Sequence, residues 1–154
     1  MAMEAAVARG RPLLVLEDDA ILTPVMARLG NIMQAAPPDW GMLRLSCRTK
    51  QTCLRVGRGD GFDLVTYWRM ANSSVGYVIT PEGARQFLAA FPVRTRPVDE
   101  DMRRPWLHGV PSYGVVPEPV LHNDVSSSID PQRRRETDGR MRFKAMGLMN
   151  GSDA

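Results

Sequence analysis

The stretch Leu13-Leu14-Val15-Leu16-Glu17-Asp18-Asp19 decides the expected fold, because a short apolar run ends abruptly in three adjacent acids. Continuous rather than alternating apolarity predicts a strand that is buried on both faces, as in a mostly parallel sheet. The carboxylates then lie at the carboxyl end of that strand. Adjacent like charges repel one another, so they need water, a cation or a basic partner. A divalent ion shared with phosphate oxygens is one interpretation, and a solvated acidic turn before the next helix is the other.

Further helix and strand signals follow in an irregular alternation. Thr23-Pro24 predicts the N-cap and first residue of a helix whose apolar spacing continues to about Ala36, and Thr80-Pro81 predicts a second helix in the same way. Further strands are expected at 42–45, 62–70, 75–80 and 113–116, and an irregular segment is expected at 48–61. This order predicts an α/β fold with a mixed sheet flanked by helices.

Length and charge indicate one domain with a basic end. The chain has 154 residues and a net charge of +3, and a chain of this length buries enough surface for a core of its own. Residues 131–154 hold six basic and three acidic side chains, so the whole net charge lies there. We interpret 1–130 as the domain and 131–154 as a solvated, disordered tail, with peripheral contact to an anionic membrane or glycolipid as the alternative. No nucleic-acid partner is expected.

Targeting signals are lacking in the sequence. The longest apolar runs fall far short of the roughly 18 residues of a membrane-spanning helix, and the N-terminus has no signal-peptide core. We therefore expect a cytoplasmic protein without a transmembrane segment. Cys47 and Cys53 have no second cysteine pair and no nearby His, which favours two ordinary thiols over a zinc site.

Residues 11–30 look much like the first strand and helix of a response-regulator receiver domain. A receiver also needs a phosphoacceptor Asp after its third strand and a Lys after a later strand. Trp68 stands at the first of these positions, and Lys50 and Lys144 are the only lysines of the chain. The receiver interpretation is therefore kept only as a degenerate, non-enzymatic binding module.

Five segments in order resemble glycosyltransferase family 25, which contains bacterial lipopolysaccharide-biosynthesis galactosyltransferases and collagen galactosyltransferases. The segments are LVLEDDA (14–20), PDWGMLRL (38–45), SVGYVITPEGA (74–84), PVDEDM (97–102) and SYGVVPEPVLH with SSI (112–122 and 127–129). Each segment alone is a weak signal, and their order over most of the chain is fairly specific. Gly41 departs from the family, which often has Asp at this place.

The resemblance implies a partial GT-A-like, Rossmann-like fold and a metal-dependent, inverting transferase. The donor would be a nucleotide sugar, with galactose from UDP-galactose as the expected hexose, and the acceptor a lipopolysaccharide or related glycan or glycolipid. A cation, Mn²⁺ or Mg²⁺, would neutralise the donor diphosphate. Its ligands would be Asp18 and Asp19, helped by Glu17 and by His122.

The resemblance also implies a base and a sugar-binding side. A carboxylate must take the proton of the acceptor hydroxyl, and Asp101 is the expected base, with Asp99 as the other candidate. Ser74, Gly76 and Tyr77 would line the sugar side. Ordinary structural roles stay open for these residues: the acids could be a solvated first turn of a short helix, Tyr77 could be plain core, and His122 could be an ordinary packed or surface side chain.

One departure from the family lies at the front of the sequence. Family members carry an N-terminal half that binds the nucleotide, whereas here twelve residues precede Leu13. We therefore expect either a fragment of a longer protein or a diverged, non-catalytic transferase remnant. We also expect the strand at Leu13 to present an apolar edge that permits self-association.

Overall fold

The structure is a computed structural model that describes residues 2–47, 51–70, 73–93 and 95–123. Residues 1–123 form one compact unit. The expected tail at 131–154 and the SSI segment lie outside the described residues. The helices are α1 (Ala2–Arg9), the 3₁₀ helix η1 (Pro24–Arg28), α2 (Leu29–Ala35), α3 (Pro81–Ala90), α4 (Val98–Met102) and α5 (Pro105–His108). The strands are β1 (Leu13–Leu16), β2 (Ala20–Leu22), β3 (Met42–Arg44), β4 (Cys53–Gly59), β5 (Phe62–Tyr67), β6 (Gly76–Ile79), β7 (Ser112–Val116) and β8 (Val120–His122).

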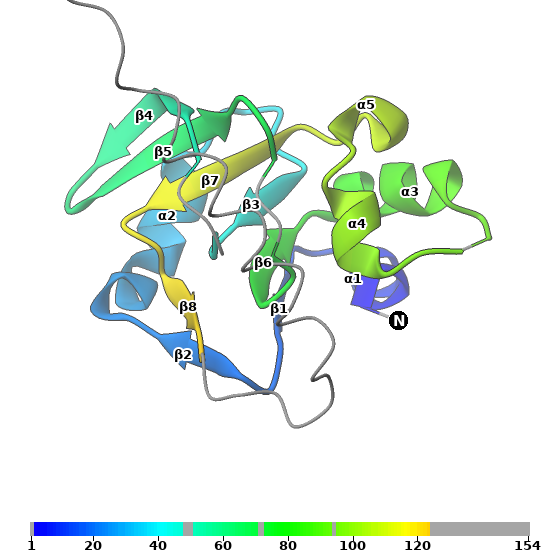
Figure 1. Cartoon of the computed structure of the whole chain (residues 1–154), viewed down its shortest axis with the longest axis horizontal. Helices are drawn as coiled ribbons and strands as arrows, with labels where there is room; N and C mark the ends of the chain where they lie inside the picture. Colours follow the sequence, from blue (N-terminus) through cyan, green and yellow to red (C-terminus); the bar gives the residue numbers. More distant parts are fainter. Residues whose placement is uncertain (1, 48–50, 71–72, 94, 124–154) are drawn as a thin grey trace, which may run out of the picture. The chain divides into compact units, whose positions relative to one another are not determined.

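Six of these strands form one mixed sheet in the order β1-β6-β3-β7-β5-β4 (Figure 1). The β3–β7 pair is parallel, and the other neighbouring pairs are antiparallel. It follows that β1, β3 and β7 run in the same direction. β2 and β8 form a separate antiparallel pair. The expectation of an α/β fold with a mixed sheet and flanking helices is thus confirmed.

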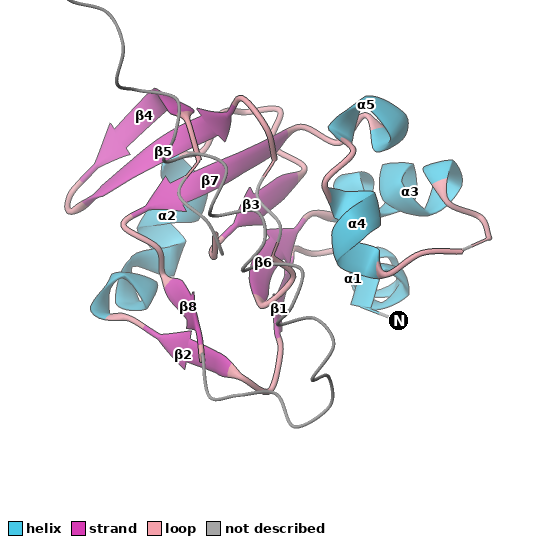
Figure 2. Cartoon of the chain, viewed as in Figure 1, coloured by secondary structure: helices cyan, strands magenta, loops and turns pink. Residues whose placement is uncertain are grey.

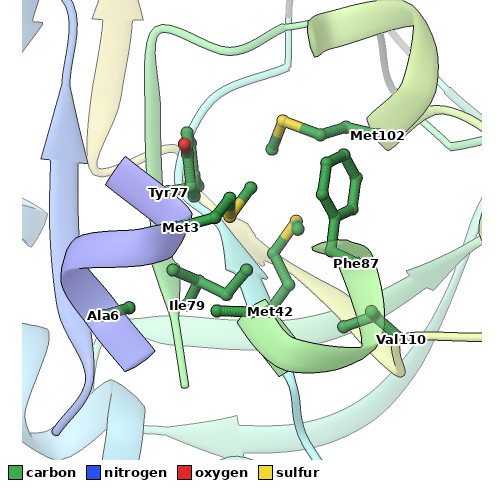
Figure 3. Packing of buried hydrophobic residues seen from close by; sticks show 9 residues of the cluster. Met3, Ala6, Met42, Tyr77, Ile79, Phe87, Met102 and Val110 are labelled. Carbon is green, nitrogen blue, oxygen red and sulfur yellow. The ribbon is translucent and has the colours of Figure 1, made fainter. Parts of the chain in front are cut away.

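Alternating side chains of the sheet enter two hydrophobic clusters, one on each face. Met42 and Ile79 belong to the cluster beneath α1 and α3, where Phe87 and Met102 pack beside them (Figure 3). Leu43 and Val78, the alternate residues of the same strands, belong to the other cluster. That second cluster also receives side chains from α2, which lies with η1 apart from α1, α3, α4 and α5 in Figure 2. Each face of the central strands is therefore covered.

The predicted two-sided burial of β1 is wrong. β1 is an edge strand whose exposure alternates: Leu13 and Val15 are half-buried, while Leu14 and Leu16 are exposed. Its single neighbour among the described strands is β6, which pairs with it antiparallel. A continuous apolar run does not require burial on both faces, because an apolar side chain on an edge strand can stay exposed. The expected free apolar edge is present among the described residues.

The expectation of an irregular segment at 48–61 is also wrong for residues 53–59. Residues 53–59 form β4, which pairs with β5 across the turn Asp60-Gly61. Gly61 has a φ of 75°, which suits glycine in a hairpin turn. Most side chains of β4 are exposed, so the strand lacks the apolar alternation that would have revealed it.

The helix expected from Thr23 to Ala36 begins as a 3₁₀ turn and becomes α-helical only at Leu29. The Thr23 hydroxyl does not cap it. Instead this hydroxyl contacts the Glu118 and Pro119 carbonyl oxygens at 2.9 and 3.2 Å, ahead of β8. The Thr80 prediction is confirmed, because its hydroxyl oxygen accepts a hydrogen bond from the Gly83 N–H.

The helix α1 at the front of the chain was not predicted from the sequence. The helix ends at Arg9, and the next residue, Gly10, has a φ of 63° and an N–H that contacts the Ala6 and Val7 carbonyl oxygens. A glycine in this conformation is a common helix C-terminus. No helix among the described residues has the length and apolarity needed to cross a membrane.

Candidate functional site at the carboxyl ends of β1 and β3

Four chain segments converge where β1 and β3 end. The Glu17 N–H donates to the Val75 carbonyl, which extends the β1–β6 pairing beyond the last residue of β1. The Leu45 N–H donates to the Gly76 carbonyl, and the Leu45 carbonyl accepts from Val120 N–H. Backbone hydrogen bonds therefore hold the ends of β1 and β3 beside the starts of β6 and β8.

Asp18 and Asp19 are the central residues of a tight turn between β1 and β2. The Ala20 N–H donates to the Glu17 carbonyl at 3.2 Å and closes this turn. Asp18 is exposed, whereas Asp19 is only partly exposed. Glu17 is exposed like Asp18, so Asp19 is the least exposed of the three acids.

The structure brings Asp19 and His122 together. His122 ends β8 and pairs with Ala20 across the two-stranded sheet. Its Nε2 lies 3.4 Å from Asp19 Oδ2, and the Asn123 N–H donates to the Asp19 carbonyl. The other carboxylate oxygen, Asp19 Oδ1, is buried and has no hydrogen-bond partner among the described residues. A buried carboxylate oxygen without a donor is costly, and a cation would relieve that cost.

Glu17 is held differently from Asp19. Its carboxylate accepts a hydrogen bond from the Ser74 hydroxyl. A residue predicted as a metal ligand and one predicted for the sugar side are therefore neighbours. Because Ser74 lies two residues before the start of β6, this bond ties the acidic turn to the segment between β5 and β6.

Arg44 is a buried cation of this region that was not predicted as a site residue from the sequence. Its side chain is fully buried at the end of β3, where its Nη2 donates to the Ser73 carbonyl. The Ser73 hydroxyl is hydrogen-bonded to the Ser46 hydroxyl at 2.5 Å. Burial lowers the pKa of Arg44 to about 10, and Asp99 is among the groups whose charge opposes that shift. An arginine within the apolar run Met42–Leu45 was the signal that could have found it.

The two candidate bases on α4 have different surroundings. Asp101 is buried, with 2% of its surface exposed, and its Oδ1 lies 3.9 Å from an Nη1 of Arg96. Asp99 is half-buried, and its charge acts on Arg44. Asp99 is thus the more accessible carboxylate of the pair, and it is electrostatically coupled to the end of β3.

The remaining predicted sugar-side residues serve packing. Tyr77 is buried in the cluster beneath α1 and α3. A Cβ built at Gly76 would lie 2.8 Å from Val120 Cγ2, so the space that this glycine leaves open is filled by β8. His122 itself belongs to β8, a strand that sequence analysis did not predict.

Asp19 and His122 supply two ligands for a cation, so the remaining ligands would have to come from other molecules. Within the described ranges, no group of three or more His, Cys, Asp or Glu side chains is arranged to hold a metal ion. One carboxylate, one imidazole and an exposed neighbouring acid fit an ion that takes its other ligands from water and phosphate oxygens. Cys47 and Cys53 are thiols and are not joined in a disulfide.

No protein-family model matches the sequence, and a search of curated proteins finds no matching relative.

Proposed function

We propose that this chain is a glycosyltransferase of the family 25 type, which transfers a hexose, galactose from UDP-galactose, to a lipopolysaccharide or related glycan acceptor. The observation that carries the proposal is the approach of His122 to Asp19, with a buried Asp19 oxygen that lacks a donor. The motif order described above supports the choice of family. The convergence of Glu17 and Ser74 at the same turn supports a shared site.

Asp19 and His122 would hold Mn²⁺, with Asp18 and Glu17 close by in the turn. When bound, the cation neutralises the charge that develops on the departing nucleotide diphosphate. Mn²⁺ suits this mixed carboxylate and imidazole pair better than Mg²⁺, which favours oxygen ligands alone.

Asp99 is the better candidate for the base. The acceptor hydroxyl oxygen forms the new bond to the anomeric carbon of the sugar, the bond to the nucleotide oxygen breaks, and the nucleotide keeps that electron pair. The hydroxyl proton passes to a carboxylate. The carboxylate must reach the acceptor, and Asp101 is enclosed beside Arg96 whereas Asp99 is partly open.

The receiver-like alternative is not favoured by the sheet. A receiver needs a parallel sheet of order 2-1-3-4-5, and here β3–β7 is the one parallel pair among the described strands. The non-catalytic transferase remnant remains the competing form of the proposal, and donor binding distinguishes it.

Calorimetric titration of the full chain with Mn²⁺ and UDP tests the proposal. Binding of UDP should require Mn²⁺ and should weaken in Asp19→Ala. A folded sample that binds neither would overturn donor recognition. For the base, Asp99→Asn should abolish transfer and leave Mn²⁺ and UDP binding intact, while Asp101→Asn should retain part of the turnover. The reverse order of effects would assign the base to Asp101.

A further inference from the structure

The free edge of β1 consists of the outward backbone groups of Leu14 and Leu16. Glu17 donates to Val75, so the backbone of Glu17 faces β6. Backbone groups alternate along an antiparallel strand, and with the observed register this directs Leu13 and Val15 toward β6 as well. The N–H and C=O groups of Leu14 and Leu16 then point away from the sheet, where no described strand pairs with them.

The side chains of Leu14 and Leu16 at this edge are apolar and partly exposed. Leu14 and Leu16 expose 37% and 39% of their surface on the face opposite α1. Val15, between them, packs on the covered face. An edge with both free hydrogen-bonding groups and exposed leucines is the kind of strand that natural proteins normally protect with charges, bulges or a partner.

The charges at the two ends of β1 are opposite in sign. Arg11 precedes the strand, and Glu17, Asp18 and Asp19 follow it. Arg11 and Asp18 are both exposed. Two copies of the strand placed antiparallel would set the basic end of each beside the acidic end of the other, whereas a parallel arrangement would set like charges together.

We propose that two copies of this chain associate through their β1 strands, which pair antiparallel about a two-fold axis at Val15. Leu14 of each copy lies opposite Leu16 of the second copy, and each such pair exchanges both backbone hydrogen bonds. In the alternative register the two-fold axis lies at Leu14, and Leu16 of one copy faces Pro12 of the other. Proline has no N–H, so the carbonyl of Leu16 would lose its hydrogen bond. The Val15 register uses both outward N–H groups, joins the leucines across the strands and matches Arg11 with the acidic turn.

Sedimentation velocity and light scattering of the full chain, measured over the micromolar range without added metal, test this arrangement. Dimer is expected in the parent. Leu14→Lys with Leu16→Lys should yield monomer with an unchanged circular-dichroism spectrum, because both side chains are exposed. The matched control is Ile21→Lys with Leu121→Lys, an exposed cross-strand pair of β2 and β8, which should leave the dimer intact. A parent that stays monomeric, or equal loss of dimer in both variants, overturns the proposal.

A charge exchange tests the register. Arg11→Glu should weaken dimerisation about tenfold at low salt, because each of the two symmetric contacts becomes repulsive. Adding Asp18→Arg to that variant should restore most of the affinity. Absence of rescue, with both variants folded, would exclude the antiparallel Val15 register. These measurements use neither metal nor nucleotide, so their outcome is independent of the proposed transferase activity.

Discussion

The imidazole Nε2 of His122 lies 3.4 Å from the carboxylate Oδ2 of Asp19. Asp19 belongs to the turn after β1 and His122 ends β8, so the pairing of β2 with β8 determines this approach. The hydrogen bond from the Asn123 N–H to the Asp19 carbonyl fixes the same two segments by their backbones. The two side chains are therefore positioned by strand pairing, which keeps candidate ligands in place before a cation arrives.

Removal of either member of this pair should weaken Mn²⁺ binding. We expect Asp19→Ala and His122→Ala each to lower the Mn²⁺ affinity at least about tenfold, since even supporting residues of metal sites have effects of this size. Glu82→Gln, an exposed acid of α3, should leave the affinity unchanged. Calorimetric titration with Mn²⁺ alone measures all three. Unchanged affinity in both the Asp19 and His122 variants would place any cation elsewhere.

Replacement of Arg44 should destabilise the chain. Arg44→Met keeps most of the buried volume but leaves the Ser73 carbonyl without its donor. A buried polar group that loses its partner costs about 1–3 kcal/mol of unfolding free energy. Arg85→Met, at an exposed position of α3, should change stability by less than about 0.5 kcal/mol. Urea unfolding followed by circular dichroism compares them, and equal stability of both variants would contradict a structural role for Arg44.

A glycine pair explains how α3 meets the start of β3. A Cβ at Gly83 would lie 2.5 Å from the Gly41 carbonyl oxygen, and a Cβ at Gly41 would lie 2.6 Å from Val110 Cγ1. Gly83→Ala should therefore cost about 1–3 kcal/mol, because backbone must move to admit the methyl group. This close approach also gives a physical reason for glycine, rather than a bulkier residue, at 41.

Gly30→Ala is the matched control for Gly83→Ala. Gly30 lies inside α2 and has no atom within 4 Å of a built Cβ. This change should stabilise the chain by about 0.5–1 kcal/mol, since alanine favours the helix. Thermal unfolding of the two variants should move the melting temperature in opposite directions. A loss of stability in Gly30→Ala comparable to that in Gly83→Ala would refute the packing argument.

Acid should destabilise the fold through His108. This side chain is buried against Phe87 and Phe91, and its Nδ1 accepts a hydrogen bond from the Val110 N–H. Burial lowers the pKa of His108 from 6.5; the Met102 carbonyl and Asp101 oppose the shift, and Arg44 adds to it. The unfolded chain therefore binds the proton first as the pH falls below 6.5, and unfolding free energy is lost until the pH reaches the lowered pKa.

Unfolding measured between pH 8 and pH 5 tests the role of His108. His108→Gln should be less stable at pH 8 but should lose less stability on acidification than the parent. His122→Gln is the control, and its stability should depend on pH in the same way as that of the parent. Parallel pH profiles of the parent and His108→Gln would mean that another group carries the acid sensitivity.

Local sequence signals predicted several elements well. The apolar run Met42–Leu45 and the Thr80-Pro81 helix start correspond to β3 and α3, because both depend on short-range chemistry. The acids of residues 17–19 were correctly placed at the end of a strand, since an apolar run that stops in charges has few other interpretations. Two local signals were not used. The Asp-Gly pair at 60–61 is typical of a hairpin turn and could have predicted β4, and Gly10 could have predicted the C-terminus of α1.

Tertiary structure decided what these elements do. By itself, the sequence determined that residues 13–16 form a strand followed by acids, but only pairing with β6 made that strand an antiparallel edge with exposed leucines. The approach of His122 to Asp19 depends on the β2–β8 pairing, and the burial of Arg44 depends on its neighbours on both sides in the sheet. Hydrogen bonds within a segment depend on the residue types of that segment, so the local sequence predicts them. Pairing between distant strands depends on packing throughout the fold, so no short stretch of sequence determines it.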